Sequence, residues 1–241
     1  MYTNFPFSHR REEPESGVLY LVGTPIGNLS DISFRAIKIL KDVSLIACED
    51  TRQTKKITTR YEISNRLISF NKHNSSKRIP QIINYLKEGK SVALVTDAGL
   101  PSICDPGEDL VKIAKNNRFE TICIPGPSAS LTALISSGFP ASKFIFEGFL
   151  PKKKNERYKI LNEISKNEKT TIIFESPHRL NKLLSELKEH CGLHKEVYVC
   201  RELTKKFEEQ IYDSVDNLIS FFKDREILGE ITIVIKGIDR N

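Results

Sequence analysis

Short apolar runs alternate with amphipathic segments along the first half of the chain. Five runs, "VLYLV", "VSLIAC", "LISF", "SVALVT" and "ETICI", are continuously apolar instead of alternating with polar residues. Such runs are typical of strands buried on both faces of a parallel sheet that helices cover. The segments between them include helical patterns such as "DISFRAIKIL" and "EDLVKIAKN". The pattern predicts an α/β domain with a mostly parallel sheet.

The pattern changes near Ser128. "KFIFEGF" and "TTIIFES" predict strands on either side of a helix over roughly 155–165, and "RLNKLLSELKEH" has leucines at the spacing of an amphipathic helix. "EVYVCREL", "EQIYDS" and "EITIVIKG" predict strands whose short connections allow antiparallel pairing. We therefore expect a flexible tail over 1–16, an N-terminal α/β domain over 17–127 and a C-terminal α/β domain with a mixed sheet over 128–241.

Composition narrows the class of protein. The 241 residues, 39% of them hydrophobic, suffice for one large or two small domains. No apolar run has the roughly 20 residues of a membrane span, and the first residues lack the apolar core of a secretory signal. The five cysteines are odd in number and have no C-x-x-C spacing, which argues against a disulfide framework or a zinc ribbon. "HCGLH" has no second cluster beside it, so we expect no metal site.

Three cysteines, Cys48, Cys123 and Cys200, follow apolar runs. We interpret them as buried, reduced thiols, which fits a reducing cytoplasm.

The charge balance suggests an anionic partner. The formal net charge is +6, and "PKKKNERYK", "RQTKK" and "RELTKK" concentrate basic residues. Each run alone is equally well explained as a solvated surface. Taken together they favour a nucleic acid or another polyanion as substrate.

The carboxyl ends of the predicted strands carry glycine, proline and charge. "GTPIGN", "DAGLP" and "PGPSA" follow three strands, whereas "EDTR" and "NKHN" follow two others. In the second half, "EGFLPKKK", "ESPHR" and "RELTKK" also follow strands. Open α/β sheets bind ligands outside the carboxyl ends of their strands, so these loops predict a shared ligand cleft.

The loop "GTPIGN" is poorly built for a phosphate. It has neither the lysine and spacing of a Walker loop nor the first glycine pair of a dinucleotide fingerprint. Pro25 removes a backbone N–H where a phosphate would need a donor. Asp97, in "DAGLP", would repel phosphate but suits a hydroxyl, an amino group or a cation. Both loops indicate an uncharged or cationic ligand.

Seven blocks occur in the order and spacing of one known family. They are "LYLVGTPIGNLSDISFRAIKIL", "LIACEDTRQT", "ALVTDAGLPSICDPG", "PGPSASLTAL", "FEGFLPKK", "FESPHRL" and "CRELTKKFEE". Over roughly 17–237, the chain resembles the branch of the tetrapyrrole methylase superfamily that methylates small-subunit ribosomal RNA. The resemblance implies two α/β domains with S-adenosylmethionine between them, a homodimer, and 2′-O-methylation of a cytidine ribose in the decoding region of 16S ribosomal RNA. The chain differs from the family at Thr96, where serine is commoner, and at Leu100, where threonine is commoner.

The resemblance also implies site residues. The expected cofactor contacts are Pro25, Ile26, Gly27, Asp97, Ala98, Gly99, Ile103, Pro125, Gly126, Ser128 and Ala129. The candidates for the general base, unranked, are Glu49, Asp50, Glu147, Glu175 and His178. We expect RNA contacts from Arg52, Lys152, Lys153, Lys154, Arg157, Arg179 and Arg201. The roles of Arg179, Arg201 and Glu202 in the family motifs stay open.

Several of these residues can also be explained by a purely structural role. Asp50 and Arg52 can form an ion pair that holds a loop, and Glu175 and His178 can cap the helix that begins near Pro177. For the whole protein, one alternative is an enzyme of the same fold acting on a tetrapyrrole precursor. Another is a non-catalytic RNA-binding protein, although the chain has neither the aromatic block of an RRM nor a KH-type G-X-X-G.

Overall fold

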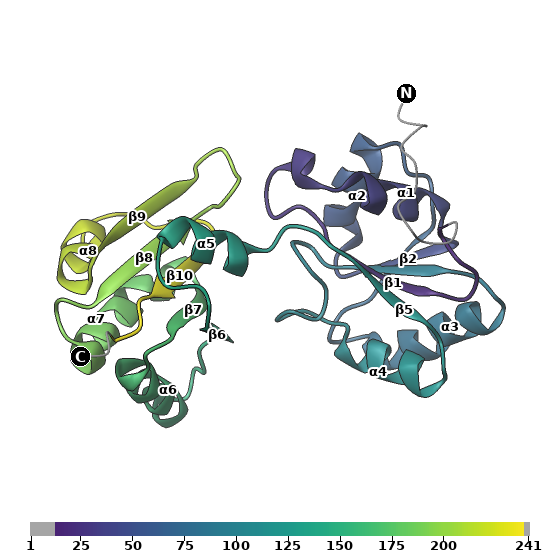
Figure 1. Cartoon of the computed structure of the whole chain (residues 1–241). Coiled ribbons are helices and arrows are strands. Elements are labelled where there is room, and N and C mark those ends of the chain that lie inside the picture. The colour runs from purple at the N-terminus through teal and green to yellow at the C-terminus, as the bar shows by residue number, and fades with distance from the viewer. Residues whose placement is uncertain (1–12, 239–241) are drawn as a thin grey trace. The chain divides into compact units, whose positions relative to one another are not determined.

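A computed structural model of the chain describes residues 13–238, and the fold consists of two compact units, Met1–Pro127 and Ser128–Asn241 (Figure 1). Residues 1–12 of the expected tail lie outside the described residues. The adjoining residues 13–16 are attached to the first unit. The Glu13 carboxylate accepts hydrogen bonds from Arg35 at 2.6 and 2.7 Å, and the Ser16 hydroxyl donates to the Gly89 carbonyl at 2.6 Å.

The first unit is built on a parallel sheet in the order β3-β2-β4-β1-β5. Its strands are β1 (Leu19–Val22), β2 (Leu45–Cys48), β3 (Leu67–Ser69), β4 (Val92–Val95) and β5 (Thr121–Ile124). The helices are η1 (Leu29–Asp31), α1 (Phe34–Asp42), α2 (Thr51–Arg60), α3 (Ser75–Lys87) and α4 (Glu108–Asn116). The parallel sheet predicted from the continuous apolar runs is confirmed.

Both faces of this sheet are buried. One apolar cluster joins strand residues such as Tyr20 and Ile46 to α1 and α2, and the other joins Leu19 and Leu94 to α3 and α4. Neighbouring residues of a strand point to opposite faces, so Leu19 and Tyr20 belong to different clusters. Burial on both faces is the physical reason that these strands carry no polar alternation.

The second unit contains a mixed sheet in the order β6-β7-β10-β8-β9. β6 and β7 are parallel, and the other pairs are antiparallel. The strands are β6 (Phe144–Phe149), β7 (Thr170–Glu175), β8 (Glu196–Arg201), β9 (Glu209–Ser214) and β10 (Ile231–Ile235). The helices are α5 (Ala129–Ser137), α6 (Lys154–Lys166), η2 (Pro177–Arg179), α7 (Leu180–Cys191) and α8 (Val215–Phe222). The predicted mixed sheet is confirmed.

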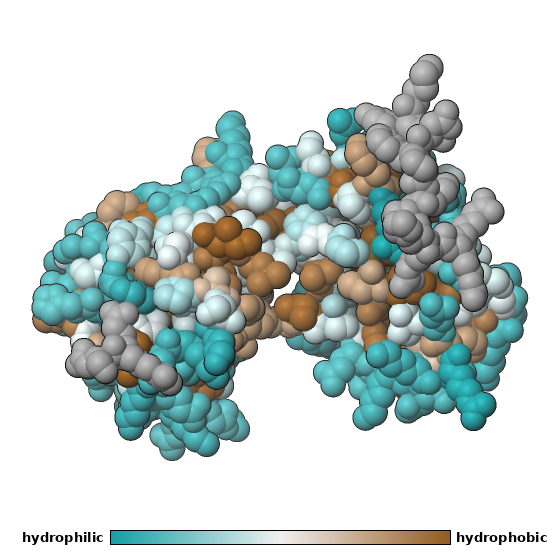
Figure 2. All heavy atoms as spheres, in the orientation of Figure 1, coloured by the Kyte–Doolittle hydropathy of each residue, from teal (hydrophilic) through white to brown (hydrophobic). Residues whose placement is uncertain are grey.

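The helices of this unit lie on opposite faces of its sheet. α5 covers one face, and α6, α7 and α8 share an apolar cluster with the other (Figure 1). Leu131 and Ile135 of α5 are exposed, and Figure 2 shows a hydrophobic patch over this helix. α8 was not predicted, although Val215, Leu218 and Phe222 have helical spacing and Ser214 caps the first turn by accepting a hydrogen bond from the Asn217 N–H.

Two of the three cysteine expectations hold. Cys48 and Cys200 are buried, and burial raises the pKa of their thiols to about 11 and about 12. The expectation for Cys123 is wrong, because this residue of β5 is exposed. No helix within residues 13–238 combines the length and apolar character that crossing a membrane requires.

Candidate functional site

The loops that follow β1 and β4 are joined by a short antiparallel bridge. The Thr24 N–H donates to the Gly99 carbonyl at 2.9 Å, and the Gly99 N–H donates to the Thr24 carbonyl at 3.1 Å. The buried Thr24 hydroxyl also donates to the Thr96 carbonyl at 3.1 Å. Gly99 has φ +81°, a conformation that glycine adopts without strain. The loops "GTPIGN" and "DAGLP" therefore form one structural element.

The loop after β5 approaches the same place through backbone atoms alone. A Cβ on Gly23 would lie 2.7 Å from the Gly126 Cα, and a Cβ on Gly126 would lie equally close to the Gly23 Cα. No side chain fits at either position without displacing backbone. Three strand-end loops thus meet at the carboxyl edge of the sheet, where open α/β sheets bind ligands.

The expected cofactor residues in these loops differ in accessibility. Pro25 and Ile26 are buried, and Ile26 packs against Gly99, where an added Cβ would lie 3.5 Å from its side chain. Gly27, Asp97 and Ile103 are exposed, Ile103 by 46%. Ala98, Gly126, Ser128 and Ala129 are half-buried, Gly99 is buried, and Pro125 is exposed.

Two carboxyl groups share one hydroxyl beside these loops. The Thr96 Oγ1 lies 2.8 Å from Glu49 Oε2 and 2.7 Å from Asp105 Oδ2. A hydroxyl has a single proton, so it donates a hydrogen bond to one carboxyl group and accepts one from the other. Burial, opposed by the Thr96 hydrogen bond and reinforced by the Glu49 charge, raises the pKa of Asp105 to about 6. Below about pH 6, Asp105 carries a proton that it can donate to the Thr96 Oγ1, and the Thr96 hydroxyl can then donate to Glu49.

Asp97 is a third carboxylate at this edge. Its Oδ1 accepts a hydrogen bond from the Asp50 N–H at 3.0 Å. Although the residue as a whole is exposed, partial desolvation of its carboxylate raises the pKa of Asp97; the Asp50 hydrogen bond works against this, and the charges of Glu49 and Asp50 add to it. An accumulation of negative charge of this kind favours a cationic ligand and opposes a phosphate.

Asp50 has a structural explanation. Its carboxylate receives hydrogen bonds from the Arg52 guanidinium at 2.6 to 3.1 Å and from the Arg52 N–H at 2.8 Å, and it caps α2. These bonds lower the pKa of Asp50 to about 2, so it is a poor proton acceptor. The Arg52 side chain is 88% exposed and remains open to a partner.

The loop between β4 and α4 is strained. Ser102 and Cys104 have φ of +70° and +65°, which residues other than glycine seldom adopt. The buried Ser102 hydroxyl has no hydrogen-bond partner among the described residues. Backbone of this kind persists only where surrounding structure holds it, and it concentrates at functional sites. This strained loop delivers Asp105 to the Thr96 hydroxyl.

In the second unit, Arg157 and Glu175 form a buried ionic network. Arg157 donates to Glu186 at 2.7 Å and to Glu175 at 3.1 Å, and all three side chains are at most 8% exposed. Arg179 reaches the other Glu175 oxygen at 2.6 Å. The RNA contact expected of Arg157 is therefore a wrong expectation, because the guanidinium is buried. Glu175 is fully occupied by two cations and is removed from the candidates for the general base.

The other expected residues of this unit are accessible. His178 is exposed, and Glu147 of β6 is half-buried, with a pKa that burial and the Glu163 charge raise. Lys152, Lys153 and Lys154 are exposed at the start of α6. In Figure 2 the surface over α6 is hydrophilic.

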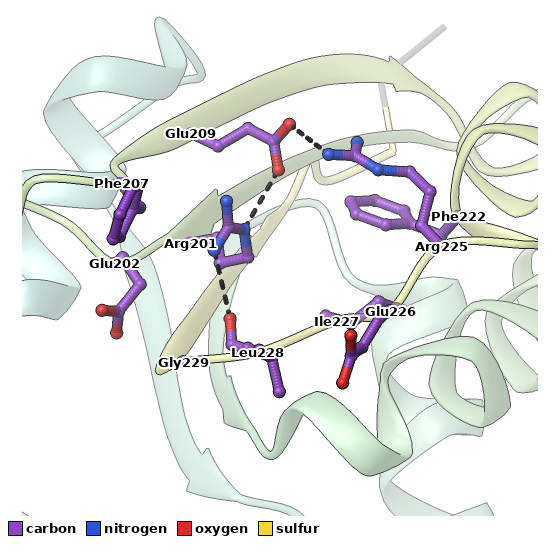
Figure 3. A pocket seen from close by; sticks show the side chains of 10 residues that line it. All are labelled: Arg201, Glu202, Phe207, Glu209, Phe222, Arg225, Glu226, Ile227, Leu228 and Gly229. Carbon is purple, nitrogen blue, oxygen red and sulfur yellow. Dashed lines mark hydrogen bonds and ion pairs between the residues drawn. The ribbon is translucent and has the colours of Figure 1, made fainter.

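Arg201 lies in a pocket of about 290 Å³ that sequence reasoning did not find. Its Nε donates to Glu209 at 3.1 Å, and its Nη1 donates to the Leu228 carbonyl at 3.2 Å (Figure 3). Arg225 donates to the second Glu209 oxygen at 2.8 Å. The apolar wall contains Phe207 and Phe222. Only the tertiary fold joins the segments 201–209 and 222–229, so no sequence motif could reveal the pocket.

Thr96 and Asp105 were also missed as partners of Glu49. Their contact depends on the positive-φ residues of the intervening loop, for which the sequence gives no signal beyond "CDPG". Among residues 13–238, no group of three or more histidines, cysteines or carboxylates is placed to hold a metal ion.

Comparison with known proteins first defines the class. A family model described as tetrapyrrole (corrin/porphyrin) methylases matches residues 18–219. A cobalt precorrin-4 methyltransferase structure aligns with a TM-score of 0.70 at 17% identity, covering 91% of this chain and 95% of the other. A uroporphyrin-III-C-methyltransferase from Thermus thermophilus aligns with a TM-score of 0.66 at 15% identity, covering 91% and 94%. At such low identity, these structures establish the fold alone.

The sequence relatives are more specific. A protein of Thermotoga maritima named ribosomal RNA small subunit methyltransferase I is 48% identical over 92% of this chain and 99% of its own length. The Bacillus subtilis protein of the same name is 47% identical over 92% of this chain and 76% of its own length. The chain belongs to the tetrapyrrole methylase family and, within it, to the ribosomal RNA small subunit methyltransferase I group. The resemblance drawn from the seven sequence blocks is confirmed.

Proposed function

We propose that the protein transfers a methyl group from S-adenosylmethionine to the ribose 2′-oxygen of a cytidine in the decoding region of 16S ribosomal RNA. The names of its relatives support a small-subunit RNA substrate. The observation that carries the cofactor proposal is the group of three carboxyls, Glu49, Asp97 and Asp105, beside loops whose backbones approach closely.

These residues fit a cationic cofactor. S-adenosylmethionine carries a sulfonium and an ammonium group, and carboxylates in a partly buried site favour positive charge. The residues that would hold it are Gly27, Asp97 to Gly99, Ile103 and the turn Pro125–Ala129. Pro25 and Ile26 would support the loop from behind, because both are buried. Bound there, the cofactor supplies an electrophilic methyl group.

Glu49 is our choice for the proton acceptor. A ribose hydroxyl is a weak nucleophile until its proton is taken by a group within hydrogen-bond reach. Glu49 lies among the cofactor loops, and the Thr96 hydroxyl holds its carboxylate in place. Asp50 and Glu175 are each neutralised by arginine. Glu147 and His178 remain alternatives to Glu49.

The start of α6 is our choice for the RNA backbone contact. Lys153 and Lys154 occupy the amino end of a 13-residue helix, where the helix dipole already contributes positive potential. An anionic phosphate bound there would relieve the repulsion between the lysine ammonium groups and the positive end of the helix dipole. Lys152, the exposed Arg52 and the half-buried Arg179 extend the basic surface of their own units. We also propose a homodimer and a reducing, cytoplasmic location, on the family resemblance and the free thiols.

The deciding experiment is mass spectrometry of small-subunit RNA after incubation of assembled subunits with the protein and methyl-deuterated S-adenosylmethionine. We expect one labelled methyl on a cytidine ribose in the decoding region. A label on a base, or on a tetrapyrrole precursor offered in parallel, would contradict the proposal. Glu49→Gln, Glu147→Gln and His178→Asn, compared under single turnover, identify the base as the one whose loss lowers the rate of methyl transfer most.

A further inference from the structure

The pocket beside Arg201 is fixed by contacts between two loops. The Glu202 N–H donates to the Glu230 carbonyl at 2.9 Å, and the Glu230 N–H donates back to the Glu202 carboxylate at 2.9 Å. Lys205 bridges both carboxylates at 2.8 and 2.9 Å. A Cβ on Gly229 would lie 2.4 Å from the Glu202 side chain, so only glycine lets the loops meet.

The contact between these two loops holds two residues in an unfavourable backbone conformation. Glu202 and Thr204 have φ of +54° and +64°. Neither is glycine, asparagine or aspartate, the residues that tolerate this region best. These strained residues lie in the segment that forms one wall of the pocket. Backbone strain of this kind is more typical of a functional site than of a connecting turn.

The pocket presents hydrogen-bond donors that the protein does not use. Within residues 13–238, the Arg201 Nη2, the Arg225 Nη1 and the Glu226 carboxylate have no hydrogen-bond partner, although the Arg225 guanidinium lies 4.3 Å from the Phe221 ring centre. Glu209 remains ionised between the two arginines, because their hydrogen bonds lower its pKa against the opposing effect of partial burial. Donors and an acceptor therefore line the same small cavity (Figure 3).

The charge of the pocket argues against a phosphate as its occupant. The lining contains two guanidinium groups, Arg201 and Arg225, and three carboxylates, of which Glu202 is already paired with Lys205. A phosphate would meet no net positive charge there. A neutral ring with its own donors and acceptors matches this lining better.

The walls favour a flat aromatic ring. Phe207 at the rim is 65% exposed, and the Lys206 ammonium lies 5.5 Å from its ring centre. Leu228, on the facing segment, is 57% exposed. Exposed aromatic rings are the platforms on which proteins stack unpaired bases of RNA. The volume of about 290 Å³ is suited to a single base.

We propose that this pocket holds one unpaired nucleobase of the RNA substrate, stacked on Phe207 and hydrogen-bonded by Arg201, Arg225 and Glu226. The Lys206 ammonium lies beside it for the adjoining phosphate. The inference rests on the proposed function, since it assigns a further contact to the same RNA.

The test measures binding of a fluorescein-labelled, twelve-nucleotide single-stranded RNA of mixed sequence by anisotropy. We expect Phe207→Leu to weaken binding about five-fold or more, the effect of losing one stacked base. Phe207→Tyr, which keeps the ring, retains the affinity. Phe34→Leu is the matched control, because Phe34 is about equally exposed, at 62%, in the first unit.

Salt dependence separates a base from a phosphate. Arg225→Gln is expected to weaken binding without changing the slope of log Kd against log salt concentration. A slope lowered by about 0.7 would indicate a phosphate contact and overturn the proposal. Unchanged affinity in Phe207→Leu, or no binding of the RNA by the wild-type protein, would also overturn it.

The same variants are then assayed for methylation of small subunits. If the wild-type protein binds the oligonucleotide through Phe207 but methylates no subunit RNA, the proposed function fails and the pocket stands. If the wild-type protein methylates and Phe207→Leu has an unchanged KM, the pocket proposal fails and the function stands.

Discussion

At the scale of the residue, one hydroxyl organises the candidate cofactor site. Thr96 follows the last residue of β4 and lies between Glu49 and Asp105, and its hydroxyl can donate its one proton to only one of the two carboxyls at a time. Asp97, the next residue, is exposed, and its carboxylate accepts a hydrogen bond from the Asp50 N–H. The three acidic side chains therefore differ in their surroundings: Glu49 and Asp105 contact the Thr96 hydroxyl, whereas Asp97 contacts a backbone N–H.

Replacing Asp97 tests the third role. Asp97→Asn keeps the shape and removes the charge, so S-adenosylmethionine affinity is expected to fall about ten-fold, the effect of one charge-assisted contact. Isothermal titration calorimetry measures the change. Asp42→Asn, an exposed aspartate at the end of α1, is the control. Equal affinities of Asp97→Asn and wild type would remove Asp97 from the cofactor site.

Replacing Asp105 tests its raised pKa through the pH dependence of stability. The folded-state pKa of Asp105, about 6, exceeds its ordinary value of 3.8, so the folded protein binds more protons than the unfolded chain. The stabilisation is present below pH 3.8 and is lost as the pH rises through about 6. Asp105→Asn mimics the protonated form, so it should be more stable than wild type at about pH 7.5 but not at about pH 4.

Thermal melting of both proteins across this pH range measures the difference. Asp42→Asn should show no such pH-dependent gain. A constant difference between Asp105→Asn and wild type at every pH would show that folding does not raise the pKa of Asp105.

At the scale of the element, the sequence predicted best those strands that are buried on both faces of the sheet. Strands such as "VALV" are continuous apolar runs because both faces are covered, and that signal is local in the sequence. The eight-residue helix α8 was missed because it has only about two turns of periodicity. Its sequence signals are the capping Ser214 and the helical spacing of Val215, Leu218 and Phe222. Contacts that depend on loop geometry, such as Thr96 with Asp105, have no local signal and could not be predicted.

The amino end of α6 provides the prediction at this scale. Lys152→Gln with Lys154→Gln should weaken binding of the labelled RNA and lower its salt slope by about 1.4, or about 0.7 for each phosphate that is no longer neutralised. The matched control is Lys112→Gln with Lys115→Gln, two exposed lysines on α4. An equal change in slope for both pairs would indicate a general charge effect instead of a contact at α6.

At the scale of the whole molecule, the two units have separate cores. The network of Arg157, Glu175 and Glu186 lies within the second unit, where it joins α6, β7 and α7. The sequence showed Arg157 in a basic run, and only the packed structure reveals it as a buried partner of two carboxylates. Charge patterns identify cations but not which of them face solvent.

Glu175→Gln tests this separation. Removing the Glu175 charge leaves the buried Arg157 guanidinium with one carboxylate partner, Glu186, instead of two, which is expected to lower the stability of the second unit by about 3 kcal/mol. Hydrogen exchange should show faster exchange in β7 and β10 and unchanged exchange in β1 and β4. The exposed Glu163→Gln on α6 should change neither. Faster exchange in both units would show that they unfold together.

The contact between Gly23 and Gly126 has a consequence for how the protein can vary. In a saturation library selected for activity, both positions should tolerate no other residue, even though neither offers a functional group. A compensating second change cannot restore either one, because the obstruction is the main chain of the facing loop and not a side chain that can be trimmed. Sequence freedom at these two positions is therefore limited by the space between two backbones, independently of any contact that the loops make with a ligand.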